Sequence, residues 1–213
     1  MKDADKLLNE AAEWRLLSLL FDCPKRDWFR QVSLLGEQVS DKQLAKAARA
    51  AQDEATEGLF HSVFGPGGPA PGREVSYRSW VEPGQLLSEL SSYYDAFGYK
   101  TSTEEVPDHI AVETGFMGYL CLKELYAREC DDTENAEVTA DAARSFVDDH
   151  LSKYAEKLDS LLSDSGIEYL ECAGKSLFER VGPDKDKSKL REAALPVLAE
   201  DEDETMFECG AAA

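Results

Sequence analysis

The stretch 105–110 reads Glu-Val-Pro-Asp-His-Ile and decides how the middle of the chain folds. Pro107 fits the first turn of a helix, because its missing N–H has no partner to lose there. Asp108 then places a carboxylate beside the free N–H groups at the positive end of that helix. His109 and Glu113 are four residues apart, so they share one helix face. This gathering of acids and an imidazole could hold a cationic peptide, hold a metal ion or only cap the helix.

Apolar residues follow helical spacing on both sides of this stretch. The helix that begins at Pro107 is predicted to run to about Arg128, and an earlier helix begins after Pro83 and stops at Gly98. No segment alternates with a strand period for long enough to build a sheet, and no repeat of fixed period is present. The sequence therefore predicts an all-α fold, a single-domain helical bundle.

Caps and breakers predict further boundaries. A short helix is expected at 28–35, closed by Gly36. The run 40–43, Ser-Asp-Lys-Gln, is a capping-box pattern that opens an Ala-rich helix. The acidic run 131–137 is expected to be a loop, and the spacing over 142–162 predicts one continuous helix.

A long irregular segment separates the two halves of the bundle. Residues 65–72 read Gly-Pro-Gly-Gly-Pro-Ala-Pro-Gly, and this density of glycine and proline forbids regular structure. We expect a hinge loop at about 64–83, which is either functional or an ordinary surface connection. The all-helical domain is predicted to span 1–183, and a charged, solvated tail is predicted at 184–213.

The charge balance limits the classes of partner. The chain has 43 acidic and 23 basic residues, which gives a net charge of −20. Such a field repels the phosphate backbone of nucleic acids and anionic membrane surfaces, and it attracts a basic peptide or protein patch. Solubility, or adaptation to a salty cytoplasm, would explain the same acidity.

The sequence shows no sign of a membrane-spanning or exported segment. No apolar run approaches the roughly 20 residues of a transmembrane helix, and no signal peptide is recognised at 1–10, so we expect a cytoplasmic protein. The five cysteines are scattered, contain no C-x-x-C and show no metal-ligand spacing. Most should be small buried residues, whereas Cys209 in the tail is expected to be exposed. No metal or other cofactor is predicted.

Catalytic motifs are scarce. Only three histidines are present, and Asp108-His109 reverses the order His-Asp found in helical metal phosphohydrolases. No G-x-S-x-G and no P-loop occurs, although 174–176 reads Gly-Lys-Ser within a helical pattern. Two alternatives stay open for these residues. One is a structural histidine bonded to a neighbouring acid, and the other is a metal-dependent helical hydrolase that uses Asp108, His109, Glu113 and His150.

The order of several segments resembles the TorD/DmsD/NarJ family of cytoplasmic chaperones for molybdenum enzymes. The segments together span about Phe64 to Leu158, and each is short, so the specificity lies in the ordered set. They are Phe64-Gly65-Pro66 with Tyr77, Tyr94-x-x-Phe97-Gly98, Pro107-Asp108-His109 with Glu113 and Phe116-Met117, and Phe146-Val147-x-x-His150-Leu151 with Tyr154 and Leu158.

The resemblance implies a chaperone without catalytic turnover. It would bind the twin-arginine signal peptide, or the apo form, of the catalytic subunit of a molybdopterin-dependent oxidoreductase. It would hold that subunit in the cytoplasm until its cofactor is inserted. Relatives that act on subunits without a leader also exist, so an exported client and a retained client both fit. The long loop allows either a monomer or a domain-swapped dimer.

A receptor for a twin-arginine leader needs carboxylates beside an apolar surface, because the leader joins a cationic region to an apolar one. By the resemblance, Asp108 and Glu113 pair with the arginines, Pro107 fixes the geometry and His109 orients the acids. Aromatic side chains receive the apolar part. The complete predicted peptide-binding set is Phe64, Tyr77, Tyr94, Pro107, Asp108, His109 and Glu113.

Overall fold

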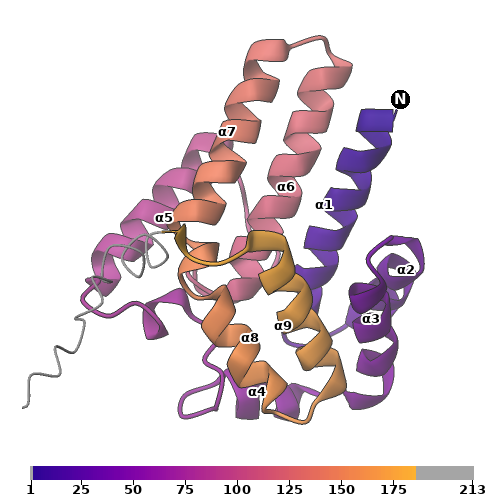
Figure 1. Ribbon diagram of the computed structural model, residues 1–213, viewed down its shortest axis with the longest axis vertical. Coiled ribbons are helices and arrows are strands. Elements are labelled where there is room, and N and C mark those ends of the chain that lie inside the picture. Colours follow the sequence, from indigo (N-terminus) through magenta and orange to yellow (C-terminus); the bar gives the residue numbers. More distant parts are fainter. Residues whose placement is uncertain (1, 186–213) are drawn as a thin grey trace, which may run out of the picture.

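Helix α6 (Ile110–Glu129) is the central helix of the fold, and α1 (Lys2–Leu20) and α7 (Thr133–Asp149) pack against it (Figure 1). The computed structural model describes residues 2–185. Within that range the chain forms nine α-helices, two short 3-10 helices and no strand, so the predicted all-α class is confirmed. The other α-helices are α2 (Trp28–Gln38), α3 (Lys42–Glu54), α4 (Glu57–Phe64), α5 (Pro83–Phe97), α8 (Ala155–Ser163) and α9 (Glu168–Val181).

The N-terminal half of α6 is buried on every side, and its glycines allow α1 to approach closely. A Cβ on Gly118 would lie 3.2 Å from the carbonyl oxygen of Ala11, and a Cβ on Gly115 would lie 3.0 Å from Ser18 Oγ. Ser18 donates a 2.7 Å hydrogen bond to the carbonyl oxygen of Ala111 across the same contact. Small residues on α6 therefore set the spacing of these two helices.

Helix α5 joins the bundle mainly through aromatic rings. The Tyr94 ring meets the Phe116 ring at a centroid distance of 4.9 Å, and Phe116 meets Phe146 of α7 at the same distance, both edge to face. Gly98 ends α5 in the left-handed conformation, with φ of 67°, and its N–H bonds the carbonyls of the last turn. The predicted stop at Gly98 is confirmed.

In a second group of helices, α2, α3 and α9 pack against α1, and α8 packs against α9 (Figure 1). Arg180 of α9 joins this group to α1 through ion pairs with Glu13, at 2.9 Å, and with Asp41, at 3.2 Å. Asp41 also caps α3 by accepting hydrogen bonds from the N–H groups of Gln43 and Leu44. The cap is therefore Asp41, and the capping box predicted to start at Ser40 is wrong by one residue.

Two boundaries in this region differ from the prediction. Helix α2 continues past Gly36, because this glycine faces α3, where a Cβ would lie only 2.4 Å from the Cβ of Ala48. Gly36 is thus a point of close helix contact and does not end the helix. Helix α4 was not expected; Thr56 starts it by accepting a 3.0 Å hydrogen bond from the N–H of Leu59.

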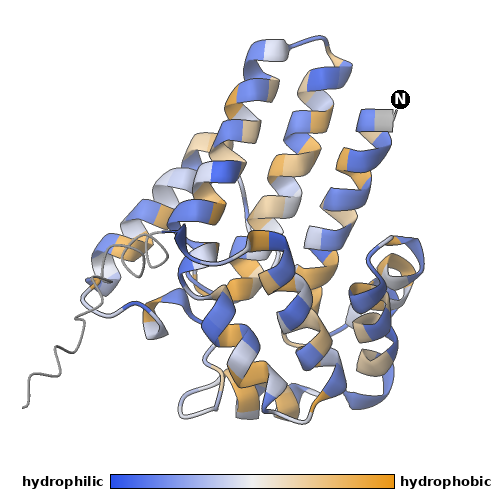
Figure 2. Cartoon of the chain, in the orientation of Figure 1, coloured by the Kyte–Doolittle hydropathy of each residue, from blue (hydrophilic) through white to orange (hydrophobic). Residues whose placement is uncertain are grey.

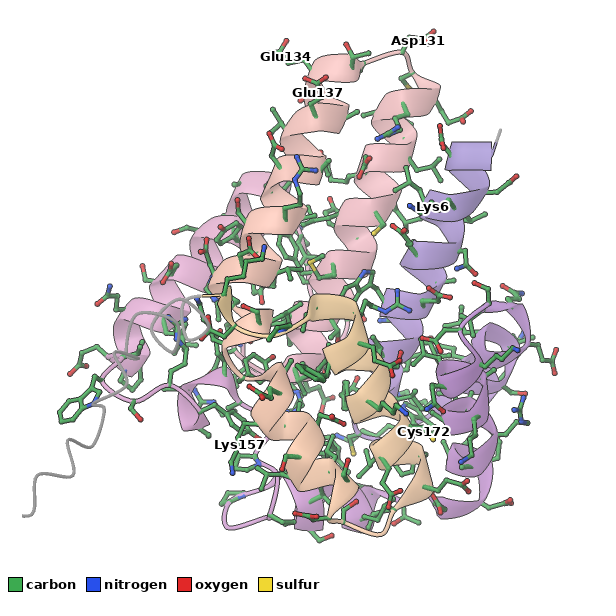
Figure 3. All side chains as sticks on the ribbon, viewed as in Figure 1. Lys6, Asp131, Glu134, Glu137, Lys157 and Cys172 are labelled. Carbon is green, nitrogen blue, oxygen red and sulfur yellow. The ribbon has the colours of Figure 1, made fainter. Side chains whose placement is uncertain are left out.

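The acidic run 131–137 is mostly helix, so its prediction as a loop is wrong. Only a short turn separates α6 from α7, with Asp131 at φ of 57°. Asp132 then caps α7 by accepting a hydrogen bond from the N–H of Asn135, and acids in a first helical turn are favourable. Figure 3 shows Asp131, Glu134 and Glu137 together at this end of the hairpin, and Figure 2 shows that the turn is hydrophilic.

The single helix predicted over 142–162 is also wrong, because the chain breaks at His150. This residue has φ of −121° and ψ of −75°, outside the helical region. The short 3-10 helix η2 (Leu151–Lys153) then leads into α8. The break turns the buried His150 ring toward the segment before α5, where it meets Glu74.

The segment between α4 and α5 is irregular apart from the 3-10 helix η1 (Glu74–Ser76), and its role as a hinge stays a prediction. Over residues 2–185, no helix combines the length and the apolar character needed to cross a bilayer. The tail predicted at 184–213, with Cys209, lies outside the described residues except for its first two positions.

Candidate functional site

The predicted motif lies immediately before α6 and not inside its first turn. Pro107 and Asp108 form a turn, and His109 is the residue that caps the helix, with its Nδ1 accepting a 3.2 Å hydrogen bond from the N–H of Ala111. The prediction that Pro107 begins the helix and that Asp108 caps it is therefore wrong. The imidazole takes the capping position because the Asp108 carboxylate points to Arg73 instead.

The irregular segment after α4 is joined to this turn by backbone hydrogen bonds. The N–H of Glu74 bonds the carbonyl of Asp108, and the N–H of Ile110 bonds the carbonyl of Gly72, both at 2.8 Å. Gly72 has no room for a side chain, since a Cβ there would lie 2.3 Å from His109 Nε2. The His109 ring thus fills the space that a side chain at position 72 would need.

Asp108 and Arg73 form the ion pair at the centre of the contact. Arg73 Nε lies 3.0 and 3.1 Å from the two carboxylate oxygens of Asp108. The Asp108 side chain is completely buried, whereas that of Arg73 is 41% exposed. Burial, and secondarily the positive charge of Arg73, lower the pKa of His109 to about 4. His109 is therefore neutral at pH 7, which suits its role as a hydrogen-bond acceptor at the helix cap.

A second acid group lies one turn further along α6. The buried Glu113 carboxyl accepts a 2.9 Å hydrogen bond from the Tyr154 hydroxyl. Burial, and then the negative charge of Glu74, raise the pKa of Glu113 well above its ordinary value. Glu74 is itself buried and pairs with Arg78 at 2.7 Å and with His150 Nδ1 at 3.1 Å. Burial thus favours the protonated carboxylic acid form of Glu113.

The predicted aromatic residues surround the same place. The Phe64 ring packs against the His109 ring at a centroid distance of 6.3 Å. Tyr77 stacks on Tyr154 at 5.5 Å, and the Tyr94 hydroxyl donates a 2.9 Å hydrogen bond to the carbonyl of Pro107. The structure therefore brings the whole predicted set together around the start of α6, with most of it buried.

One part of the set reaches the surface. Tyr94 and Pro107 line a pocket of about 410 Å³ between the end of α5 and the segment that precedes α6. Asp95 and Glu105 contribute carboxylates to the same pocket, and Lys100 contributes an ammonium group. Asp95 was not among the predicted site residues, although it stands inside the Tyr94-x-x-Phe97 segment. Nothing in the local pattern pointed to Lys100.

Comparison with known proteins identifies the family. A profile described as nitrate reductase delta subunit matches residues 34–159, which is more than half of the chain and includes the whole contact described above. The chain belongs to the nitrate reductase delta subunit family. This is the NarJ/TorD type of family that the sequence motifs resemble, so that prediction is confirmed.

Curated relatives of this family member carry chaperone names. It is 34% identical over 117 residues to the selenate reductase assembly chaperone protein of Thauera selenatis, which covers 54% of this chain and 58% of the relative. It is 32% identical over 98 residues to the chlorate reductase assembly chaperone protein of Ideonella dechloratans, with coverage of 45% and 49%. The chain therefore spans about half the length of the curated relatives it matches.

A solved structure shares the fold of this family member. The crystal structure of a putative redox enzyme maturation protein from Archaeoglobus fulgidus superposes with a TM-score of 0.57 at 17% sequence identity. The match covers 80% of this chain and 93% of the other chain. At that identity the likeness shows the helical fold alone.

The hydrolase alternative gains no support in this member of the nitrate reductase delta subunit family. Within residues 2–185, its four residues do not bring three metal-ligating atoms within reach of one another. Asp108 is paired with Arg73, and His109 uses Nδ1 to cap α6. Neither the family profile nor the three proteins named above is described as a hydrolase.

Proposed function

We infer that the chain is a cytoplasmic maturation chaperone, with no catalytic turnover, for the catalytic subunit of a molybdopterin-dependent oxidoreductase. It binds the leader peptide or the apo form of that subunit until the cofactor is inserted. The observation that carries this proposal is the family match over residues 34–159, supported by two relatives named as assembly chaperones. The net charge of −20 agrees with a basic client segment.

The surface pocket beside Tyr94 is the proposed first contact for a leader peptide. It offers the carboxylates of Asp95 and Glu105 next to the ring of Tyr94 and the ring of Pro107. Guanidinium groups bind carboxylates through charge-assisted hydrogen bonds, and aromatic surfaces receive apolar side chains. The pocket thus offers a complementary surface to both the cationic part and the apolar part of a twin-arginine leader.

Asp108 has a proposed role that requires a movement of the irregular segment. Its carboxylate is completely buried and already binds Arg73, so a client arginine reaches it only by replacing the Arg73 guanidinium. Arg73 is the exposed member of the pair, and it lies on the segment that the sequence predicts to be a hinge. The client arginine would then occupy the place beside Asp108 that Arg73 occupies in the free chain. A protonated Glu113 would contribute a hydrogen bond and no charge.

A capture experiment tests the proposed function. Full-length tagged protein is retained from the native cytoplasm, and the bound proteins are identified by mass spectrometry. Enrichment of the catalytic subunit of a molybdopterin enzyme, with any leader uncleaved, is the expected result. Retention of general chaperones alone would contradict the proposal and leave only the family and the fold.

The pocket is tested separately, with a synthetic peptide that copies the N-terminal segment of the captured subunit. Asp95→Lys is expected to weaken peptide binding. Glu89→Lys, an equally drastic change on the same helix outside the pocket, is the matched control. Equal affinity of both variants would remove the pocket from the proposal without affecting the capture result.

A further inference from the structure

Three side chains of types that can bind a metal ion, from two distant parts of the sequence, lie close together beside α4. They are Cys23, from the segment after α1, and Glu57 and His61, from α4 itself. The cysteine sulfur, a carboxylate oxygen and an imidazole nitrogen all lie within 4.8 Å of one another. None of the three belongs to the buried contact at the start of α6, so this cluster needs its own explanation.

The two residues of α4 lie on one exposed face of the helix. Glu57 and His61 are one helical turn apart, and His61 Nε2 lies 3.7 Å from a carboxylate oxygen of Glu57. Their side chains are about 60% exposed, at 61% and 60%, so both can change rotamer without disturbing the core. The backbone beneath them is fixed, because Thr56 caps α4 and the neighbouring Phe60 is buried.

The cysteine is held more rigidly. Its backbone N–H donates a 2.8 Å hydrogen bond to Asp22, and Asp22 in turn accepts a 2.9 Å hydrogen bond from the Thr103 hydroxyl. Cys23 is 6% exposed, and it lines an open pocket of about 290 Å³ together with Glu105. Cys23 thus borders this pocket, and the Glu105 carboxylate lines the same pocket.

We propose that Cys23, Glu57 and His61 bind a zinc ion, with water or the Glu105 carboxylate as the fourth ligand. Thiolate, imidazole and carboxylate are the donors that zinc takes in tetrahedral sites, at about 2.0–2.3 Å. Ligand atoms around such an ion lie roughly 3–4 Å apart, so the observed separations need an adjustment of about 1 Å by the exposed side chains. Binding would release the thiol proton to solvent and leave the thiolate on the metal.

Such an ion would join the α1–α2 connection to α4, directly before the irregular segment that carries Arg73. The consequence is a clip that fixes one end of that segment. Cys23, Glu57 and His61 do not line the pocket at Tyr94, and Glu105 is the one residue that this site could share with it.

Metal binding by the full-length chain tests this site. The protein is stripped with a chelator, dialysed and titrated with zinc against a chromophoric competitor, and with cobalt as a spectroscopic substitute. We expect one tight zinc equivalent, a thiolate-to-cobalt charge-transfer band and a rise in Tm on zinc addition. Cys23→Ser should abolish the band, and His61→Ala should weaken zinc binding at least tenfold.

Two variants keep the result interpretable. Cys172 of α9, labelled in Figure 3, is as buried as Cys23, at 6% exposure, so Cys172→Ser is the matched control and should bind zinc like the wild type. His61→Ala removes an exposed side chain and should fold normally even if Cys23→Ser does not. Wild-type zinc binding in both Cys23→Ser and His61→Ala, or a cobalt complex without the thiolate band, would overturn the proposal.

Discussion

The inner and outer layers of the candidate site differ in what their residues do. The inner layer, defined by Asp108, His109 and Glu113, is fully buried and bonded to other parts of the chain. The outer layer is the pocket at Tyr94, where Asp95 is exposed and Glu105 is half-buried. The most conspicuous sequence motif thus forms internal contacts, while the surface that a partner can reach uses less conspicuous residues. A motif of acids and histidine can therefore form intramolecular contacts that hold a segment in place, as well as bind a partner.

Breaking the Arg73–Asp108 pair should have the largest effect on the inner layer. Arg73→Ala leaves a buried carboxylate without its cation, and such a loss typically costs about 3–5 kcal/mol of folding free energy. Because Arg73 is 41% exposed, the lower end of that range is expected. Denaturant unfolding measures the change, with Lys25→Ala, which breaks an exposed pair with Glu104, as a control within about 0.5 kcal/mol of wild type.

A smaller loss is expected when the fit between Gly72 and His109 is disturbed. In Gly72→Ala the new methyl would lie 2.3 Å from His109 Nε2, so the ring or the segment must move, at a cost of about 1–3 kcal/mol. Gly84→Ala meets nothing within 4 Å, and in α5 it should be neutral or slightly stabilising. Equal unfolding free energies for the two variants would mean that the contact at Gly72 is not tight.

The protonation of Glu113 predicts a pH dependence of stability. Its folded-state pKa is raised, so the folded chain binds more protons, and stability falls as pH rises above about 4.5. The slope is up to about 1.4 kcal/mol per pH unit for one proton. His109, with its pKa lowered to about 4, acts in the opposite direction between pH 4 and 6.5, where it adds stability as pH rises.

Glu113→Gln separates these two opposing contributions. The variant should lose the decline at higher pH and keep the rise between pH 4 and 6.5, as measured by denaturant unfolding at several pH values. Glu89→Gln, on the exposed face of α5, should leave the wild-type profile unchanged. A decline that persists in Glu113→Gln would show that another group takes up the proton.

Substitutions in the outer layer should change the affinity for the client peptide and leave the free energy of unfolding unchanged. Asp95→Lys reverses one exposed charge in the pocket, and we expect roughly tenfold weaker binding of the client peptide, about 1.4 kcal/mol. The unfolding free energy should stay within about 0.5 kcal/mol of wild type, as for other surface substitutions. Isothermal titration together with denaturant unfolding distinguishes a lost contact from a disturbed fold.

Local patterns in the sequence predicted the fold well where they were strong. The buried stripe of α6 and the left-handed stop at Gly98 follow from spacing and from the freedom of glycine, and both are present. The break at His150 and the cap at His109 depend on residues far along the chain, which local spacing does not reveal. Glu74 pairs with His150, and Arg73 binds the Asp108 carboxylate and so leaves the cap to His109. At these two positions the prediction failed because a distant side chain decides the local conformation.

The candidate site was predicted as a set of residues but not as an arrangement. The resemblance selected side chains that do meet, whereas burial of Asp108 and the pairing with Arg73 come from the path of the irregular segment. The cluster of Cys23 with Glu57 and His61 shows the same limit. Glu57 and His61 are four residues apart, but Cys23 lies far from them in sequence and meets them only through the packing of α4.

The most direct test of the account is quantitative capture of the client by the wild type and by Asp95→Lys and Glu89→Lys in parallel. We expect wild type and Glu89→Lys to retain the catalytic subunit of a molybdopterin enzyme equally. Asp95→Lys should retain roughly a tenth as much at subsaturating client concentration, for the tenfold loss of affinity expected above. Absence of such a subunit from the wild-type sample would contradict the proposed function. Equal retention by all three proteins would contradict the assignment of the outer layer as the surface that binds the client.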